Sequence, residues 1–425
     1  MTTTPPTSHP LRFARGTVYI AALGLGLMVA TLGTGAMAVA RSANRSASLT
    51  ADAITARTLA VGAIQQALRI YGSSQTAREA TFGTDLVTST TIKIPNTGIP
   101  AVVSITARSN ATTKFGASTA SINITTSGQV GAARQRLSLV IEPVRTPISS
   151  LGVAGYSAGT LSYNSVSVKP ASQTIQCAGS LTMTNCNIQP TTKYGTSISR
   201  SASSGTTIKD TNPLTAPIAS SVFDYYIAVG TPINGTTISN MDKILLSPTS
   251  NPYGTVNPLG IYVLDAKGKD IRVRSSRMVC TLVVINPPST FTVDQSVNWT
   301  PARPGLPALL VQGSATISIS DDDLKEQGTN LNPTGSPYPF PSGTTNHSNG
   351  DKYPSKIDGL VYATGTITFT NGESTLHSAI AGTQLRFTNS EVTFAYDNRY
   401  LIDPPPGFYT STMTPKRGSW KILTD

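Results

Sequence analysis

The side chains that most often carry out catalysis are few in this chain of 425 residues. Its three histidines are His9, His347 and His377, and the sequence contains no HExxH, GxSxG, phosphate-binding loop or Cys/His nucleophile pattern. His347 lies in a polar run that is typical of a solvated loop. His377 lies beside a predicted strand, where a single histidine is more often structural than catalytic. We therefore expect no catalytic residue, no cofactor and no enzymatic activity.

A short acidic run offers a pattern that suits a metal ion. Asp321, Asp322 and Asp323 are followed by Glu326, and Ca²⁺ prefers several oxygen ligands. The spacing of an EF-hand loop is absent, however, and aspartate is also a preferred cap at the start of a helical turn. We favour the cap, so we expect no metal site here.

A third cluster could bind an anionic polymer. Arg272 and Arg274 alternate, so on a strand they would share one face, with Asp265, Asp270 and Arg277 close by in sequence. The same charges could equally keep the exposed face of an edge strand soluble. Glycan cleavage needs a pair of carboxylates, and no such pair is near in sequence. An alternative hypothesis follows, in which the chain is a membrane-tethered β-helix protein that binds or cleaves an anionic polysaccharide. A surface glycan would then be its partner.

The three cysteines form neither a CxxC pair nor a zinc-binding spacing with histidine. Cys177 and Cys186 could close a short loop through a disulfide in an oxidising compartment. Cys280 lies in an apolar run, which predicts a small buried side chain rather than a reactive one.

The composition indicates a chain of many short strands. Charged residues make up 12% of it, Gly and Pro are frequent (35 and 29 residues), and the formal net charge is +11. The basic residues are scattered and form no polybasic tract or RNA-binding pattern. We interpret them as solvated surface charge and expect no nucleic-acid partner.

The N-terminal region predicts a membrane anchor. No charged side chain occurs from Gly16 to Ala40, and about 20 mostly apolar residues suffice for a helix to cross a bilayer. A cleavable secretory signal is the rival interpretation, since Ala36-Met37-Ala38 matches a peptidase site, but this apolar run is longer than usual for such a signal. Basic residues flank the run equally, so charge does not decide its orientation. The residues expected to face lipid are Val18, Ile20, Leu23, Leu25, Leu27, Val29 and Leu32.

The helical pattern continues beyond the apolar run. Small or apolar residues recur at alternating steps of four and three and form one stripe of an amphipathic helix, which ends at Tyr71-Gly72. We expect this stripe to be a helix-packing seam of small residues that emerges from the membrane. Its members are Leu49, Ala53, Ala56, Ala60, Ala63, Ala67 and Ile70.

The basic leader that ends at Gly16, the apolar run and the Ala-rich extension together resemble the N-terminus of type IV pilin-like proteins. The resemblance is to the PilX-like minor pilins and the large minor pseudopilins of type II secretion. It implies that a prepilin peptidase cuts between Gly16 and Thr17, with methylation of the new N-terminus. It also implies a single-pass protein of the bacterial inner membrane, with an extracytoplasmic body and with pilin-like subunits as partners. Major pilins carry Glu at the fifth mature position, where this chain has Ala21, which suits a minor or initiating subunit.

The rest of the chain predicts two β-rich regions. Three strand-like runs lie within residues 80–146, with a hairpin break at Ser127–Gly131, and this order resembles the pilin architecture. Beyond it a Gly-initiated motif recurs at Gly159, Gly179, Gly365 and Gly382, which favours a β-solenoid over a plain sandwich. The predicted fold class is α+β, mainly β. It comprises a leader (1–16), a membrane-spanning and amphipathic helix (17–72), a small antiparallel sheet (80–146) and a parallel β-helix-like body (147–425) with an irregular insertion (321–355).

Overall fold

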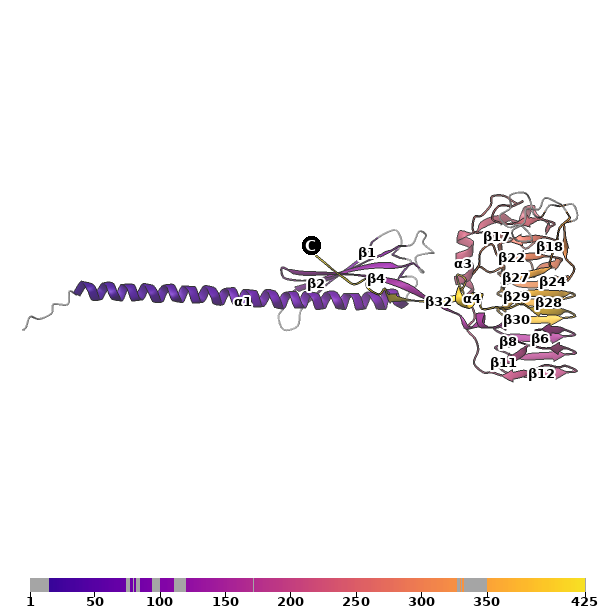
Figure 1. The fold of residues 1–425 in the computed structure, drawn as a ribbon, viewed down its shortest axis with the longest axis horizontal. Helices are drawn as coiled ribbons and strands as arrows, with labels where there is room; N and C mark the ends of the chain where they lie inside the picture. The colour runs from indigo at the N-terminus through magenta and orange to yellow at the C-terminus, as the bar shows by residue number, and fades with distance from the viewer. Residues whose placement is uncertain are drawn as a thin grey trace, which may run out of the picture. The chain divides into compact units, whose positions relative to one another are not determined.

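The computed structural model describes two compact units (Figure 1). Residues 15–73, 77–78, 80–81, 85–93, 100–110, 120–170, 172–326, 329, 331 and 350–424 are described. The first unit comprises Met1–Pro143 with Met413–Asp425, and the second comprises Val144–Thr412. The predicted fold class is confirmed: a long apolar N-terminal helix, a small antiparallel sheet and a large body of mostly parallel strands.

Helix α1 (Arg15–Ser73) is continuous over 59 residues. At 1.5 Å per residue it is about 88 Å long. Its last carbonyl groups lack partners within the helix, and Arg78 supplies one, because its Nη1 donates to the carbonyl oxygen of Tyr71 at 3.0 Å. The guanidinium also places a positive charge at the negative end of the helix dipole. The Arg78 residue is 4% exposed, so this contact also anchors the segment that follows the helix.

The small sheet of the first unit is antiparallel in its β1–β4 and β33 pairings, with the order β1-β2-β3-β4-β32 and β33 also paired with β4. Strand β1 lies outside the runs that the sequence predicted as strands. The hairpin between β3 and β4 turns at residues 131–132, at the end of the predicted break, and Gly131 adopts a positive φ of +55° that suits a two-residue turn. The strands are β1 (Leu86–Lys93), β2 (Pro100–Ser109), β3 (Ile122–Val130), β4 (Ala133–Pro147), β32 (Tyr409–Pro415) and β33 (Lys421–Leu423).

The C-terminal tail differs from the predicted domain division. Residues 413–425 were expected in the body, but they belong to the first unit, where β33 pairs with β4. The second unit is therefore an insertion between two strands of the small sheet.

The helix lies so close to Gly128 of β3 that no side chain would fit there. A Cβ atom there would overlap the carbonyl oxygen of Ala56 and come within 2.9 Å of the backbone nitrogen of Ala60. Two residues earlier, on the same face of the strand, the Thr126 hydroxyl donates to the Ala60 carbonyl oxygen at 2.9 Å. Small residues on both elements thus allow their backbones to touch, and the larger side chains of the sheet pack along the helix on either side.

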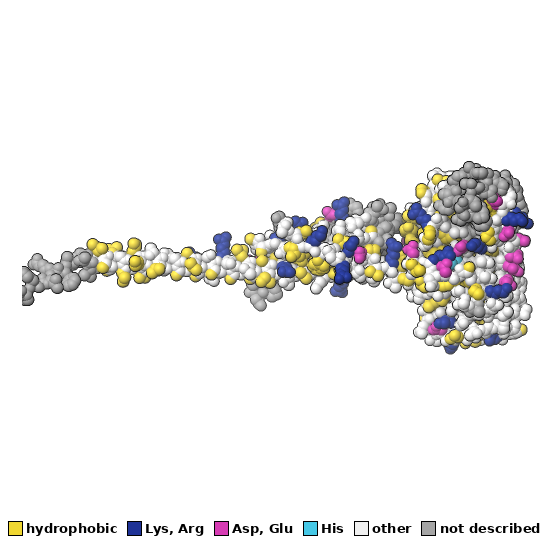
Figure 2. Space-filling view, viewed as in Figure 1, with side chains coloured by type: hydrophobic (Ala, Val, Ile, Leu, Met, Phe, Trp, Pro, Cys, Tyr) yellow, Lys and Arg dark blue, Asp and Glu magenta, His cyan; other side chains and the backbone are white. Residues whose placement is uncertain are grey.

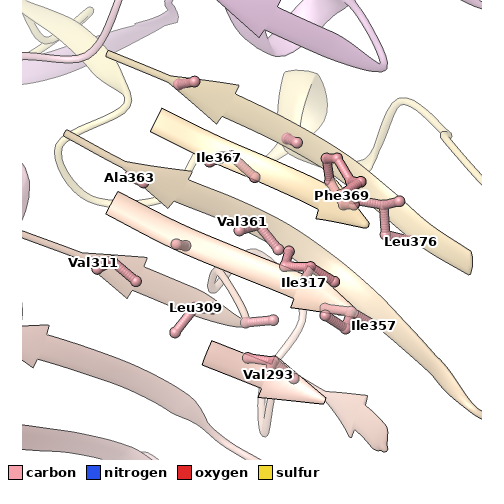
Figure 3. Close-up of a cluster of buried hydrophobic side chains, with 14 of the residues drawn as sticks. Val293, Leu309, Val311, Ile317, Ile357, Val361, Ala363, Ile367, Phe369 and Leu376 are labelled. Carbon is pink, nitrogen blue, oxygen red and sulfur yellow. The ribbon is translucent and has the colours of Figure 1, made fainter. Parts of the chain in front are cut away.

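The second unit is a parallel β-solenoid with three faces. One 16-stranded sheet supplies two of them, and a 9-stranded sheet supplies the third. Inward side chains from all faces form one core, part of which Figure 3 shows. The strands before the helical connection are β5 (Gly155–Ser157), β6 (Thr160–Asn164), β7 (Ser167–Lys169), β8 (Thr174–Cys177), β9 (Leu181–Thr184), β10 (Asn187–Ile188), β11 (Thr191–Tyr194), β12 (Ile198–Ser201) and β13 (Thr207–Lys209).

The remaining strands follow helix α3 (Ala219–Val229), and short helical segments occur at η2 (Ser149–Gly152), η3 (Gly235–Thr237) and α4 (Arg399–Ile402). The strands are β14 (Thr231–Asn234), β15 (Asn240–Asp242), β16 (Leu245–Leu246), β17 (Ile261–Asp265), β18 (Arg272–Arg274), β19 (Arg277–Val279), β20 (Thr281–Ile285), β21 (Thr290–Gln295), β22 (Asn298–Thr300), β23 (Leu309–Val311), β24 (Ser314–Ile319), β25 (Leu324–Lys325), β26 (Lys352–Tyr353), β27 (Lys356–Ala363), β28 (Thr366–Thr370), β29 (Glu373–Ala381), β30 (Gln384–Thr388) and β31 (Glu391–Phe394).

The rungs of the solenoid are not stacked in chain order. Along the longest path the order is β13-β11-β8-β5-β29-β27-β23-β20-β17-β14. The chain therefore enters in the middle at β5, winds to one end at β13 and returns through α3, which packs on β17 and β20. It then winds from the other end until β29 pairs with β5 (Figure 1). The stack is continuous in space although it is circularly permuted in sequence.

The recurring glycine motif marks four consecutive rungs of the 9-stranded sheet. Strands β28, β30, β6 and β9 are neighbours in that order, and each copy lies in register with the next. Three of the four motifs carry an aromatic residue, and these rings stack: Phe369 on Phe387 at 5.0 Å between ring centroids, and Phe387 on Tyr163 at 5.1 Å. Met183 takes the corresponding position in the fourth. Gly179 lies below Gly159, and a Cβ on it would come within 2.6 Å of the Gly159 carbonyl oxygen. The motif thus combines a corner too tight for a side chain with an inward aromatic ladder.

We predict that Gly128→Val destabilises the first unit by about 2 kcal/mol or more, because the new side chain meets backbone atoms of a rigid helix. Gly62→Ala is the matched control, since a Cβ there meets nothing within 4 Å and alanine favours a helix by up to about 1 kcal/mol. Thermal unfolding followed by circular dichroism would compare the two variants with the parent. An unchanged melting temperature for Gly128→Val would contradict this contact.

Candidate membrane anchor

The first part of α1 is apolar and uncovered on every side. The window of highest hydropathy, 1.8 on average, has none of its residues buried, so the helix is long and apolar enough to cross a membrane. The side of this segment that Figure 2 shows carries hydrophobic side chains and no charged ones. Of the predicted lipid-facing residues, Val18 has a side chain outside the described set. The others are between 60% and 72% exposed: Ile20, Leu23, Leu25, Leu27, Val29 and Leu32.

Polar side chains in the apolar segment satisfy their hydrogen bonds within the helix. The Thr31 hydroxyl donates to the Leu27 carbonyl oxygen at 3.0 Å, and the Thr34 hydroxyl donates to the Ala30 carbonyl oxygen at 2.9 Å. A hydroxyl with an internal acceptor can face hydrocarbon without losing a partner. The segment therefore presents no described polar side chain that requires water between Tyr19 and Ala40.

The predicted processing site lies at the start of this helix. Gly16 and Thr17 occupy the first turn of α1, which begins at Arg15. Arg15 and Gly16 are the described residues of the predicted leader (1–16). The rest of it, including His9, lies outside the described residues.

The predicted packing seam is used differently from the expectation. Its central members Ala56, Ala60, Ala63 and Ala67 are at most 3% exposed because they pack on the sheet of the same unit. Only Leu49, Ala53 and Ile70, at the margins of the stripe, stay exposed. The small residues that seemed available to neighbouring helices thus mainly serve the fold of this chain.

The basic cluster of the alternative hypothesis is neutralised by carboxylates. Arg272 and Arg274 share the outer face of β18 as predicted, and both lie near Asp294, at 3.6 and 3.5 Å. Arg272 also pairs with Asp270 at 3.0 Å, and Asp265 pairs with Lys267. The described residues therefore form an outer face of mixed charge rather than an open basic groove.

Arg277 has a separate structural role beneath the insertion. It is 4% exposed, lies over the Tyr353 ring at 4.9 Å and donates to the Leu331 carbonyl oxygen at 3.0 Å. Glu326, also buried, accepts from the Tyr353 hydroxyl at 2.7 Å and from the Leu331 backbone at 2.9 Å. These side chains hold together the two ends of the segment whose centre, with His347, lies outside the described residues.

The acidic run does not begin a helical turn, so the predicted cap is wrong. Asp321 and Asp322 form a bend, and the short strand β25 follows. The backbone N–H of Asp322 instead donates a hydrogen bond to the Ser320 hydroxyl oxygen at 3.1 Å. The neighbouring carboxylate of Asp321 raises the pKa of Glu373. Among the residues that the structure describes, no group of three side chains suited to a metal ion occurs.

All three cysteines are free thiols and are buried. The structure therefore has no bridge where the sequence allowed one between Cys177 and Cys186. Burial raises the pKa of Cys177 to about 11, which keeps the thiol protonated and unreactive. Cys280 is fully buried, as its apolar run predicted.

His377 is a buried member of a hydrogen-bonded network that sequence reasoning missed, and the network extends to the half-exposed Asp397. Its Nε2 lies 3.1 Å from the Asp397 carboxylate, and its Nδ1 lies 3.0 Å from the Ser378 hydroxyl. Arg399 holds Asp397 through a forked pair and also contacts Asp358 at 3.0 Å. Serine, histidine and aspartate are the residue types of a hydrolytic triad. However, the imidazole is 0% exposed and packs against the rings of Tyr396 and Tyr400, so the geometry fits a structural network.

Comparisons with known proteins add one distant likeness. No family model matches the sequence, and no curated protein matches it. Among solved structures, the competence-associated pilin ComZ from Thermus thermophilus aligns over 88% of this chain and 98% of its own, at 10% identity and a TM-score of 0.29. At that score the likeness does not establish a common fold.

We predict an acid-sensitive stability that depends on His377. Burial lowers its pKa below 6.5, so below about pH 6.5 the unfolded chain binds a proton that the folded chain does not. The free energy of unfolding should therefore decrease as the pH is lowered from 6.5, by at most about 1.4 kcal/mol per pH unit, until the pH reaches the folded-state pKa. His377→Gln should remove this slope while leaving the loss below about pH 4 that comes from Asp397, whose pKa is lowered by its bond with Arg399. Chemical unfolding at pH 8, 6 and 5 would test it, and equal slopes in both proteins would contradict it.

Proposed function

We propose that the chain is a structural, non-catalytic, membrane-anchored subunit of a pilin-like assembly, with the solenoid as its extracytoplasmic head. The observation that carries the proposal is the division of α1. One continuous helix is apolar and uncovered in its first part and packs on a small antiparallel sheet in its second part. A helix that is apolar on all sides needs lipid or other helices around it.

Three further features support a scaffold rather than an enzyme. The basic pair on β18 is neutralised, His377 is enclosed, and the cysteines are protonated thiols within the core. The leader that ends at Gly16 favours prepilin-type processing, which would make Thr17 the first residue of the membrane helix. A place in the inner membrane of a bacterium and a role as a minor subunit of a pilus or a type II secretion system follow from the same resemblance.

We expect the mature protein to begin at Thr17. Intact-mass spectrometry of protein extracted from membranes would detect this as the loss of the 16-residue leader. Gly16→Val should abolish that cut, because prepilin-type processing implies a glycine before the scissile bond. Ala38→Leu is the control: it disrupts the rival small-residue site and should leave the start at Thr17. A mature start at Met1, or one beyond Ala38, would refute prepilin-type processing.

A further inference from the structure

The two ends of the solenoid differ in how well their inward side chains are covered. At the β14 end the inward side chains Ile233, Met241 and Leu246 are at most 1% exposed, and Tyr253 packs against the core beside them. Pro232 lies within the terminal strand and has no backbone N–H to offer. This end is therefore covered and is a poor template for another strand.

At the opposite end, the inward positions of the last rung are open. Strand β12 pairs with β9 in register, so Ile198 continues the inward column of Leu181 and Arg200 continues that of Met183. Leu181 and Met183 are 1% exposed, whereas Ile198 is 36% exposed and every residue of β12 is classed as exposed. In the described part of the chain, no rung lies beyond β12 and β13.

The backbone of β12 also has a free side. Ser197 and Ser201 accept hydrogen bonds from Leu181 and Asn185 of the neighbouring rung. Because successive residues of a strand direct their N–H and C=O groups to opposite sides, those of Ile198 and Arg200 point away from the solenoid. An exposed edge of this kind is a template for another strand.

The charge at this edge selects the partner. Lys193 is paired with Asp210 at 3.2 Å, but no carboxylate among the described residues pairs with Arg200 or Lys209. Within the described part of the chain, the hydrogen bond of the Arg200 guanidinium is to the carbonyl oxygen of Gly205. A second copy docked end to end would place the same cations against each other, whereas an acidic strand would neutralise them.

We propose that the β12 edge is a strand-addition site for an extended acidic segment of another polypeptide. The added strand hydrogen-bonds along β12, places an apolar side chain beside Ile198 and places a carboxylate beside Arg200. This inference is independent of the membrane anchor and of prepilin-type processing.

The test is binding of a fluorescent peptide to the full-length protein in detergent. The probe is Thr-Val-Thr-Glu-Thr-Glu, whose Val and first Glu have the spacing of Ile198 and Arg200. We expect saturable binding that is lost when the Glu residues are replaced by Lys, and lost when alternate backbone amides are N-methylated. Absence of saturable binding, or equal binding of the N-methylated peptide, would overturn strand addition.

Two variants locate the site. Arg200→Glu should weaken binding roughly tenfold, because an attraction becomes a repulsion. Lys243→Glu makes the same charge change in the exposed corner of the β14 end and should leave affinity unchanged. An equal loss in both variants would mean that net charge alone attracts the peptide. Sedimentation of the protein as a dimer that Ile198→Asp dissociates, with no peptide binding, would make a second copy the occupant. Either result would overturn the proposal.

Discussion

The second unit depends on one constraint: a rung of a parallel solenoid can bury its inward side chains only when other rungs lie above and below it. A single coil contributes two or three strands, most of them of two to six residues, which are too short to be stable alone. Register between rungs is therefore strict, and the stacked rings of Phe369, Phe387 and Tyr163 show how closely it is kept. The constraint concerns neighbours in space, not in sequence, so it permits a stack in which the chain enters at the middle.

The first unit depends on a different constraint, which acts on its long helix. Its helix has an apolar, uncovered first part and a second part that packs on the sheet, and the sequence separates the two along its length. The apolar part keeps its hydroxyls bonded to its own carbonyl groups, whereas the later part uses alanines and Gly128 to bring its backbone against a strand. Packing on the sheet, rather than helix propensity, fixes where the second part lies.

Local patterns in the sequence were sufficient for the long apolar helix, the helix stripe and the solenoid rungs, because each depends on residues close together along the chain. They were insufficient wherever a partner is distant. The motif at Gly159 and that at Gly382 gave no sign that they lie on adjacent rungs. The alanine stripe predicted a seam without identifying its partner, and the network around His377 joins one rung to a loop that follows the next. Strand β1, with its Thr- and Ser-rich outer surface, lacked the alternating apolar pattern on which strand prediction relies.

The permuted order of the rungs also governs how the body can be made. Ser157, the last residue of the first solenoid strand β5, contacts Thr383, which lies 226 residues later. The first coils to leave the ribosome therefore have one unpaired edge until almost the whole unit has been synthesised. Closing so long a loop costs chain entropy before any contact compensates for it, and such non-local pairing is slow. The coils from β5 to β13 must therefore persist as a half-finished stack with an exposed edge at β5. During biogenesis that temporary edge, rather than the permanent one at β12, is the point at which the chain is most exposed to aggregation and most in need of a chaperone.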